Sequence, residues 1–440
     1  MPGKADRPRP GSPRAAADVS PLSPADFAFL IRLERHALEY FLDNQMSHGL
    51  MLDRQHNHGS LHAHGWCSTA TTGMGLIALA LASGPPHDLL TPSAAATRIA
   101  AAVETVLDRL PHDRGILPHF LDSATLSTYG DDSLSTIDTA WLVAGALTAA
   151  EILGDNRVRD LADRLYERID WLYWTAPDEP GHRGLVRHGK SPEGRFLTYS
   201  WDRLNGETVF MYILAEGAGS ARGLPASAWS ELQPFYGDLA GSRFCSADLG
   251  LFVFQYGLDL VDFSRWQAPG TIDLREEARR ATDANLAYCR ELAERFPTYR
   301  RHWGISPGDG PGDPPASDSY RCYSPSGPVD GTAHLTATLA SIAHRPDAVL
   351  DNLHRAEDAD APRVRGRYGF SSVNGPWVAR DMVGIDAGAA VLALDNYLFE
   401  DRVRSAFHAV RWVSQGVTRL GFTPIAPAAP MHQPAEIRSA

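Results

Sequence analysis

Five carboxylate side chains stand at or near the starts of segments that are apolar on nearly every side. They are Asp138, Glu207, Asp248, Asp330 and Asp386. In "LNGETVFMYIL", residues 204–214, Glu207 precedes an almost unbroken apolar run. One acid in the first turn of a helix is commonly a cap or a partner of the helix dipole, which contributes roughly 0.3–1 kcal/mol. Five such acids indicate a catalytic site if the segments that carry them converge on one cavity.

Carboxylates that face one confined cavity raise one another's pKa. The result is a protonated acid beside an ionised base, the pair that a glycosidic bond requires for cleavage. The helix dipole favours ionisation, so convergence alone does not identify the acid that keeps its proton. Asp330 before Gly331 is typical of an N-cap, and Asp138 has nearly the capping-box spacing from Ser135. Asn205 already offers an N-cap side chain, so capping explains Glu207 least.

Long loops add aromatic and hydrogen-bonding side chains of the kind that bind sugar rings. They contain Gly and Pro rather than periodic apolar positions, and loops of this length in a compact domain are commonly functional. Such aromatics can equally pin a loop to the protein. The candidate substrate-binding residues in these loops are Trp201, Asp202, Trp303, Asp309, Tyr368, Asn374 and Trp377, to which we add Tyr397 near the end of the last apolar segment.

Two kinds of helical segment alternate along the chain. The first kind has one apolar stripe and one charged face, and it is predicted at 24–43, 93–110, 157–172, 226–236, 273–296, 346–356 and 400–413. The second kind is apolar nearly all round after a polar start, and it is predicted at 67–83, 135–153, 205–217, 247–260, 330–342 and 384–397. A helix without a solvent-exposed polar face must be surrounded by other helices.

Six such inner helices alternating with amphipathic outer helices predict an all-α fold, an (α/α)6 toroid of two concentric rings. The alternation places the N-termini of the inner helices, and with them the acids, at one end. We predict a single domain over residues 23–416. Residues 1–22 and the Pro/Ala-rich stretch 417–440 have the composition of disordered tails.

Composition excludes several classes of protein. The chain has 440 residues, of which 44% are hydrophobic and 21% charged, and its net charge of -12 disfavours nucleic acid and anionic lipid as partners. The N-terminal stretch has no apolar core of a secretory signal, and we identify no membrane-spanning segment, so the expected location is the cytoplasm. The four cysteines lack metal-site spacing. The sequence does not indicate an oligomeric state.

A series of motifs resembles the glycoamylase-like family, which includes bacterial endo-β-1,2-glucanases and the transglycosylating domain of cyclic β-1,2-glucan synthases. The resemblance covers roughly residues 30–410, and the motifs follow in order. They are "GLMLDR" (49–54), "STIDTAWLVAGAL" (135–147), "YSWDRLNGETVFMYILAEG" (199–217), "LPASAW" (224–229), "HWGISPGDGPG" (302–312), "GPVDGTAHLTATLASI" (327–342), "RYGFSSVN" (367–374) and "VGIDAGAAVLALDNY" (383–397).

The resemblance implies an (α/α)6 barrel that needs no metal or cofactor and that hydrolyses β-1,2-linked glucose chains. Glu207 matches the family's catalytic glutamate, and we expect it to be the general acid of an inverting mechanism. Asp386 and Asp138 match acidic positions of the same cavity, and one of them is expected to act as base on water. Arg54, Trp303 and Asp309 match positions that bind substrate.

Three alternatives remain open at this point. A transglycosylase would use the same substrate, and a sugar-binding protein would keep the fold without turnover. A lyase or epimerase on this fold usually works through Tyr, His or Arg pairs, which the acids at the predicted mouth disfavour. Zinc is suggested by five histidines in one loop, but their spacing matches no defined site and we expect no metal. They are His48, His56, His58, His62 and His64.

Overall fold

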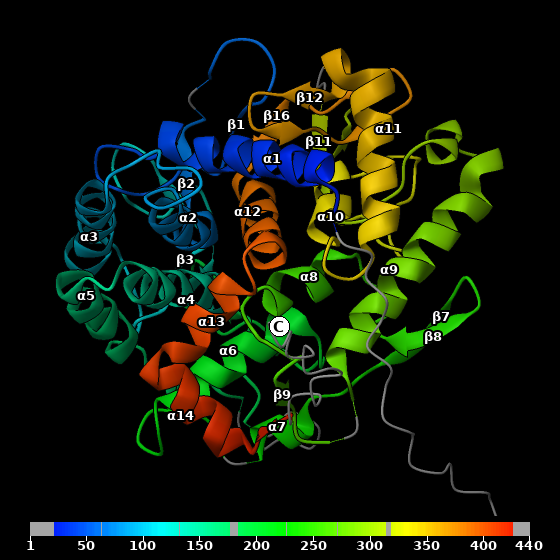
Figure 1. Ribbon diagram of the computed structural model, residues 1–440. Coiled ribbons are helices and arrows are strands. Elements are labelled where there is room, and N and C mark those ends of the chain that lie inside the picture. Colours follow the sequence, from blue (N-terminus) through cyan, green and yellow to red (C-terminus); the bar gives the residue numbers. More distant parts are fainter. Residues whose placement is uncertain are drawn as a thin grey trace, which may run out of the picture.

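The structure is a computed structural model that describes residues 22–62, 64–131, 133–176, 184–225, 227–270, 272–313 and 318–425. The described chain is mainly helical, and its strands are short (Figure 1). The predicted tails at 1–21 and 426–440 lie outside the described residues. The tail predicted from residue 417 begins too early, because helix α14 (Arg411–Leu420) ends only at Leu420 and strand β17 (Thr423–Pro424) pairs with β9 (Trp266–Gln267).

The apolar segments form helices whose residues are buried on every side. Four of them match the predicted ranges closely, and the other two are shorter than predicted. The set consists of α2 (Thr69–Leu81), α4 (Thr136–Leu153), α6 (Gly206–Gly217), α8 (Phe252–Leu258), α10 (Leu335–Ala340) and α12 (Gly384–Leu398). Helix α4 is the one described helix long and apolar enough to cross a membrane, and 78% of it is buried within the protein, as in a core helix.

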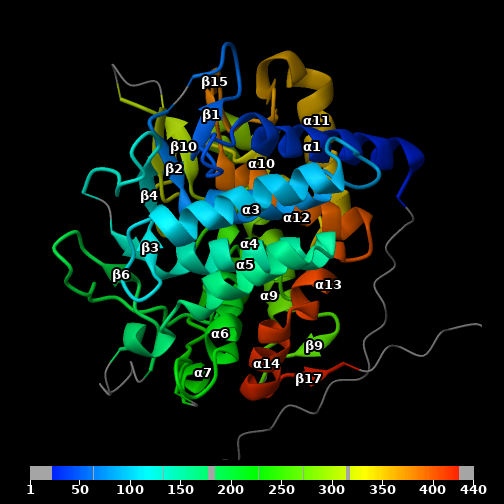
Figure 2. The same ribbon diagram turned by 90° about the vertical axis from the view of Figure 1, so that its left-hand side faces the viewer.

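The amphipathic segments form helices with one buried face. In Figure 2, α3 and α5 run side by side, and they pack on α2 and α4 respectively. The predicted helix at 400–413 is broken at Val410 into α13 and α14, and that at 226–236 is one short turn. The set consists of α1 (Pro24–Asp43), α3 (Pro92–Arg109), α5 (Asn156–Glu167), α7 (Ala228–Glu231), α9 (Leu274–Glu291), α11 (Pro346–Val364), α13 (Arg402–Ala409) and α14 (Arg411–Leu420).

Two pairs of glycines let core helices approach closely. A Cβ at Gly145 of α4 would lie 1.9 Å from the carbonyl oxygen of Gly73 in α2, and one at Gly257 of α8 would lie 1.6 Å from that of Gly206 in α6. Both distances are far below van der Waals contact, so no side chain fits at either crossing. The second crossing fixes the start of α6, the helix that carries Glu207.

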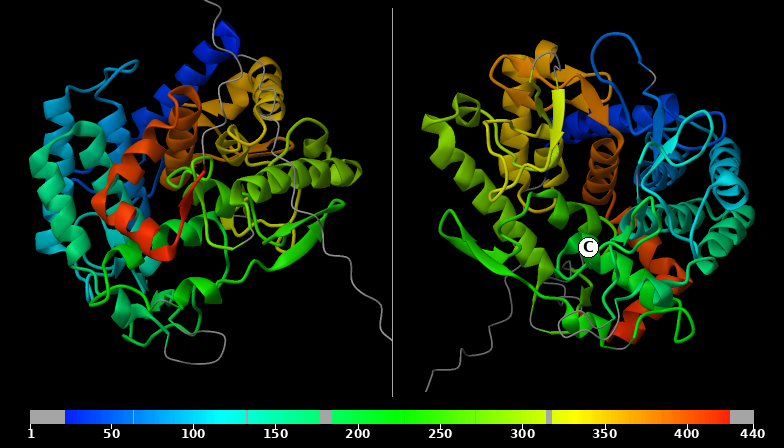
Figure 3. Two further views of the ribbon diagram at one scale, coloured as in Figure 1. Left: turned by 60° about the horizontal axis from the view of Figure 1, so that its bottom comes forward. Right: turned by 180° about the vertical axis from the view of Figure 1, so that it is seen from behind.

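Short antiparallel ladders join the long loops to one another. The helix α9 and the β7–β8 hairpin lie on the side opposite α3 and α5 (Figure 3). The paired strands are β1 (Arg54–His56) with β16 (Asp381–Val383), β2 (Trp66–Ser68) with β4 (Phe120–Asp122), β3 (Leu117–Pro118) with β5 (Leu134–Ser135) and β6 (Gly189–Lys190), β7 (Tyr236–Leu239) with β8 (Ser242–Cys245), β9 (Trp266–Gln267) with β17 (Thr423–Pro424), β10 (Gly308–Pro311) with β11 (Asp318–Arg321), β12 (Arg365–Gly366) with β13 (Gly369–Phe370), and β14 (Val373–Asn374) with β15 (Trp377–Val378).

Candidate active site

A cavity of about 410 Å³ lies where the starts of several core helices meet the loop ladders. Its wall contains three of the predicted site residues, Arg54, Asp138 and Glu207. The aromatic side chains around them come from loops and from α4 and α8. These aromatic residues are Trp66, Phe120, Tyr129, Trp141, Phe252, Tyr256 and Tyr320.

Glu207 lies in the first turn of α6. Asn205 is the N-cap, and its side-chain oxygen accepts hydrogen bonds from the backbone N–H of Thr208 at 3.1 Å and from the Thr208 hydroxyl. The cap therefore leaves the Glu207 carboxyl free to face the cavity. Burial and the nearby charge of Asp138 raise the Glu207 pKa to about 8, against a smaller lowering effect of a hydrogen bond with Trp141. Glu207 is consequently protonated at neutral pH.

Asp138 lies in the first turn of α4, and it is held by its own cap. The Ser135 hydroxyl accepts a hydrogen bond from the Asp138 backbone N–H and donates a short one to the Asp138 carboxylate. The imidazole Nε2 of His119 lies 3.6 Å from the other carboxylate oxygen. Ser135 is the N-cap and has the sequence spacing of a capping box, but Asp138 accepts from the Ser135 hydroxyl, whereas in a capping box it would accept from the Ser135 backbone N–H. Asp138 also lines the cavity, so the carboxylate that Ser135 holds places negative charge beside Glu207.

Asp386 lies in the first turn of α12, directly behind the cavity wall. The Tyr256 hydroxyl donates to its Oδ1 at 2.9 Å, and Tyr256 itself lines the cavity. Burial raises the Asp386 pKa to about 7, which the Tyr256 hydrogen bond opposes and the charge of Asp309 reinforces. Asp386 therefore contacts the cavity through the Tyr256 hydroxyl. This hydroxyl can pass a proton from the cavity to Asp386.

Arg54 connects the cavity to a group of acids at its edge. Its Nη1 lies 3.2 Å from Asp309 and 3.7 Å from Asp381, and its Nε lies 3.3 Å from Asp53. Asp309 is buried on β10 behind Arg54. Its pKa is raised by burial, against the lowering effect of the Arg54 guanidinium. Asp309 thus orients Arg54 rather than facing the cavity.

The structure places the three predicted tryptophans away from this cavity, as far as the described residues define its wall. Trp303 is buried and lines a separate small cavity beside α11, so its expected place in the cleft is wrong. The Trp201 indole N–H donates to Thr136 Oγ1 at 3.0 Å. The Trp377 indole N–H donates to Asp318 at 3.0 Å. All three pin loops to the protein.

The other predicted binding residues also have structural partners. Tyr368 is buried and donates to an oxygen of the Asp43 carboxylate, and the Asn374 amide donates to the Asp330 carbonyl. Asp202 holds its loop through its backbone carbonyl. Tyr397, predicted to bind substrate, lies at the far end of α12 and lines another cavity rather than that of Glu207.

Asp248 and Asp330 do not start helices, contrary to the sequence prediction. Helix α8 begins at Phe252 and α10 at Leu335, so both acids lie in the preceding loops. Asp248 pairs with Arg203 at 2.7 Å. The Asp330 carboxylate accepts hydrogen bonds from Tyr323 and Thr332 and organises its own loop. Convergence therefore applies to three of the five acids.

Sequence reasoning missed Tyr256, Tyr320 and His119. Tyr256 stands in an otherwise apolar core helix, and that single hydroxyl was a usable signal. Tyr320 reaches the wall because β11 pairs with β10, where Tyr320 lies opposite Asp309. His119 comes from the loop between β3 and β4. Nothing in their local sequence indicates a common site for these last two.

Comparison with known proteins shows what this chain is similar to. Residues 198–411 match the family model described as "Putative glucoamylase", which confirms the resemblance to the glycoamylase-like family. No functionally curated protein matches the chain at a significant level.

Solved structures share the fold over nearly the whole chain. A putative glucoamylase from Bacteroides uniformis has 21% identity and a TM-score of 0.79, covering 92% of this chain and 99% of its own. The endo-β-1,2-glucanase from Chitinophaga pinensis, solved with sophorotriose and glucose, has 18% identity and a TM-score of 0.74, covering 90% and 98%. The β-1,2-glucanase from Parabacteroides distasonis has 18% identity and a TM-score of 0.77, covering 91% and 60%.

Proposed function

We propose that this protein is a glycoside hydrolase that cleaves a β-glucan, with β-1,2-glucan as its substrate, by an inverting mechanism on an (α/α)6 toroid. The observation that carries the proposal is the Glu207 carboxyl, whose pKa of about 8 keeps it protonated in a cavity lined by aromatic rings. The alternation of fully buried and amphipathic helices supports the toroid. The endo-β-1,2-glucanases of similar fold support the substrate class.

In this proposal Glu207 donates its proton to the glycosidic oxygen as the bond to the anomeric carbon breaks. The negative charge of Asp138 holds that proton on Glu207 before the reaction. Asp386 acts as the base, and the Tyr256 hydroxyl passes the proton of the attacking water to it. Glu207 ends as a carboxylate and Asp386 as an acid, so proton exchange with water returns both to their starting states.

Aromatic rings and charged groups have separate tasks in substrate binding. Trp66 and Tyr129 lie 5.2 Å apart between ring centroids and offer apolar faces to the C–H groups of a sugar. Arg54 and Asp53 offer a donor and an acceptor to its hydroxyl groups. Phe252 and Tyr256 form a second aromatic wall, with ring centroids 5.4 Å apart.

The test is incubation of the purified chain with a panel of linear β-glucans, β-1,2-glucan included, followed by product analysis. We expect shorter β-1,2-linked oligosaccharides, with reducing ends that accumulate and with an inverted anomeric configuration in the first product. Longer or cyclic products without new reducing ends would identify a transglycosylase. Binding without any turnover would identify a sugar-binding protein and contradict the proposal.

A further inference from the structure

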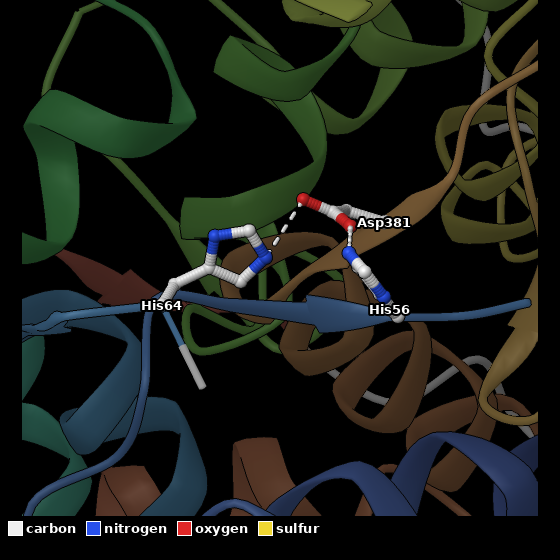
Figure 4. A group of neighbouring side chains, drawn as sticks. All are labelled: His56, His64 and Asp381. Carbon is white, nitrogen blue, oxygen red and sulfur yellow. Dashed lines mark ion pairs between the residues drawn. The ribbon is translucent and has the colours of Figure 1, made fainter. Parts of the chain in front are cut away.

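Two histidines and one aspartate converge beside the cavity, in a group to which the proposed reaction gives no role. His56 lies on β1 and faces Asp381 on β16, because the two residues are paired directly across the ladder. His64 reaches the same carboxylate from the loop that follows β1. Figure 4 shows both imidazoles directed at the two oxygens of Asp381. The candidate ligand atoms all lie within 4.8 Å of one another.

The distances within this group are longer than the length of about 2.7–2.9 Å that is usual for a charge-assisted hydrogen bond, and they leave room for an ion between the ligands. His64 Nε2 lies 3.2 Å from Asp381 Oδ2, and His56 Nε2 lies 3.7 Å from Asp381 Oδ1. Tetrahedral zinc with ligands at 2.0–2.2 Å separates neighbouring donor atoms by about 3.4 Å. The two observed separations lie on either side of that value.

The hydrogen bonding of the group leaves ligand atoms available to a cation. His56 Nδ1 lies 3.0 Å from the Ser60 carbonyl oxygen, which can only accept, so Nδ1 carries the proton and Nε2 can offer a lone pair. Among the described residues, the buried Asp381 Oδ1 accepts no hydrogen bond of ordinary geometry, and the nearest partner of the buried His64 Nε2 is Asp381 Oδ2 at 3.2 Å. The Asp381 side chain is only 9% exposed, so bulk water does not satisfy it.

The charged groups around Asp381 also favour a bound cation. Arg54 is shared among Asp53, Asp309 and Asp381. One guanidinium therefore faces three carboxyl groups, and a cation beside Asp381 would add positive charge to this acidic group. Two imidazole donors disfavour Mg²⁺ and Ca²⁺, which prefer oxygen ligands, and favour a transition metal.

We propose that His56, His64 and Asp381 bind a divalent transition-metal ion, of which zinc is the representative. Three protein ligands would leave the fourth position of a tetrahedral ion to water or to a further side chain. The ion would hold Asp381 on β16, which leaves Arg54 to Asp309 and Asp53 at the edge of the cavity. The proposal does not depend on the glycosidase activity.

The test uses the full chain, stripped of metal with a chelator and then titrated with Zn²⁺ by calorimetry. We expect one site per chain. His64→Ala and Asp381→Asn should each weaken binding by about 100-fold or more, because each removes a ligand. His58→Ala is the matched control from the same loop, since His58 Nε2 contacts Ser371 Oγ instead and its loss should leave the affinity unchanged.

Two measurements on the unaltered chain keep the proposal testable if a variant fails to fold. X-ray absorption at the zinc edge should show two imidazoles and a carboxylate oxygen, and Co²⁺ should give the visible absorption of a tetrahedral site. Competition of Zn²⁺ with Fe²⁺ and Mn²⁺ ranks the candidate ions. Absence of a stoichiometric site, or equal binding by His64→Ala and the unaltered chain, would overturn the proposal.

Discussion

Replacement of Glu207 by Gln tests both the chemistry and the electrostatics of the cavity. The amide has nearly the same shape as the carboxyl, but it cannot give up a proton. Turnover should fall by about 10²–10⁴-fold, the usual contribution of a general acid. Binding of oligosaccharide should persist, because the aromatic walls are unchanged.

The same substitution should change how stability depends on pH. The folded-state pKa of Glu207 is raised from 4.5 to about 8, so between these values the folded chain holds a proton that the unfolded chain releases. Stability of the unaltered protein therefore falls as pH rises from about 4.5 to about 8. At 1.36 kcal/mol per pH unit the full interval corresponds to an upper limit of about 5 kcal/mol. The Gln variant does not lose stability in this way, because its amide does not titrate.

The assay is urea unfolding of both proteins at pH 5 and pH 9. The difference in unfolding free energy between variant and unaltered protein should shift in favour of the variant by about 2–5 kcal/mol between the two pH values. The other titrating groups occur in both proteins, so their contributions to the difference in unfolding free energy largely cancel. Glu294→Gln is the control, because the Glu294 side chain is 96% exposed and should give neither effect.

One result would refute the reasoning about Glu207. If the stability difference were the same at pH 5 and pH 9, Glu207 would not be held protonated by burial. If turnover were lost without that shift, Glu207 would have a role in binding or positioning only. Another residue would then be the general acid.

Three further predictions follow from the same geometry. The pH profile of kcat/KM should rise through about 7 as Asp386 loses its proton and fall through about 8 as Glu207 loses its own. Arg54→Ala should destabilise the protein by about 3–5 kcal/mol in urea unfolding, because it leaves the buried Asp309 charge without its partner. Gly257→Ala should destabilise by about 1–3 kcal/mol or more and lower turnover, since its Cβ would meet the α6 backbone at 1.6 Å, and calorimetry with a turnover assay measures both.

The core helices could be predicted from the sequence because their signal is local. Each long segment that is apolar all round must be buried, and α2, α4, α6 and α12 begin and end near the predicted residues. The predictions at 247–260 and 330–342 were too long. In both segments the polar start is loop rather than helix, and the acids there bind neighbouring loops instead of capping.

The composition of the site was less predictable than its location. Glu207, Asp138 and Arg54 share a wall because they stand at helix starts or beside them. The roles of Trp201, Trp303 and Trp377 depend on which loop packs against which, and loop packing is set by contacts far apart in sequence. The pairing of β1 with β16, which unites His56 with Asp381, is the clearest case. No local pattern in either segment indicates the other.

The positions of Glu207 and Asp138 relative to their caps explain why two first-turn acids behave differently. Asp138 is the third residue after its cap, and the Ser135 hydroxyl both receives its N–H and donates to its carboxylate. Glu207 is the second residue after Asn205, whose oxygen is already occupied by Thr208. The cap oxygen therefore serves Thr208 rather than Glu207, and the hydrogen bond of Glu207 with Trp141 lowers its pKa by less than burial and the Asp138 charge raise it. The helix dipole favours ionisation at both positions, so the raised pKa of Glu207 shows that burial and the Asp138 charge prevail there. A difference of one residue in cap spacing thus separates a carboxylate that its cap hydroxyl holds, at Asp138, from a carboxyl with a raised pKa, at Glu207.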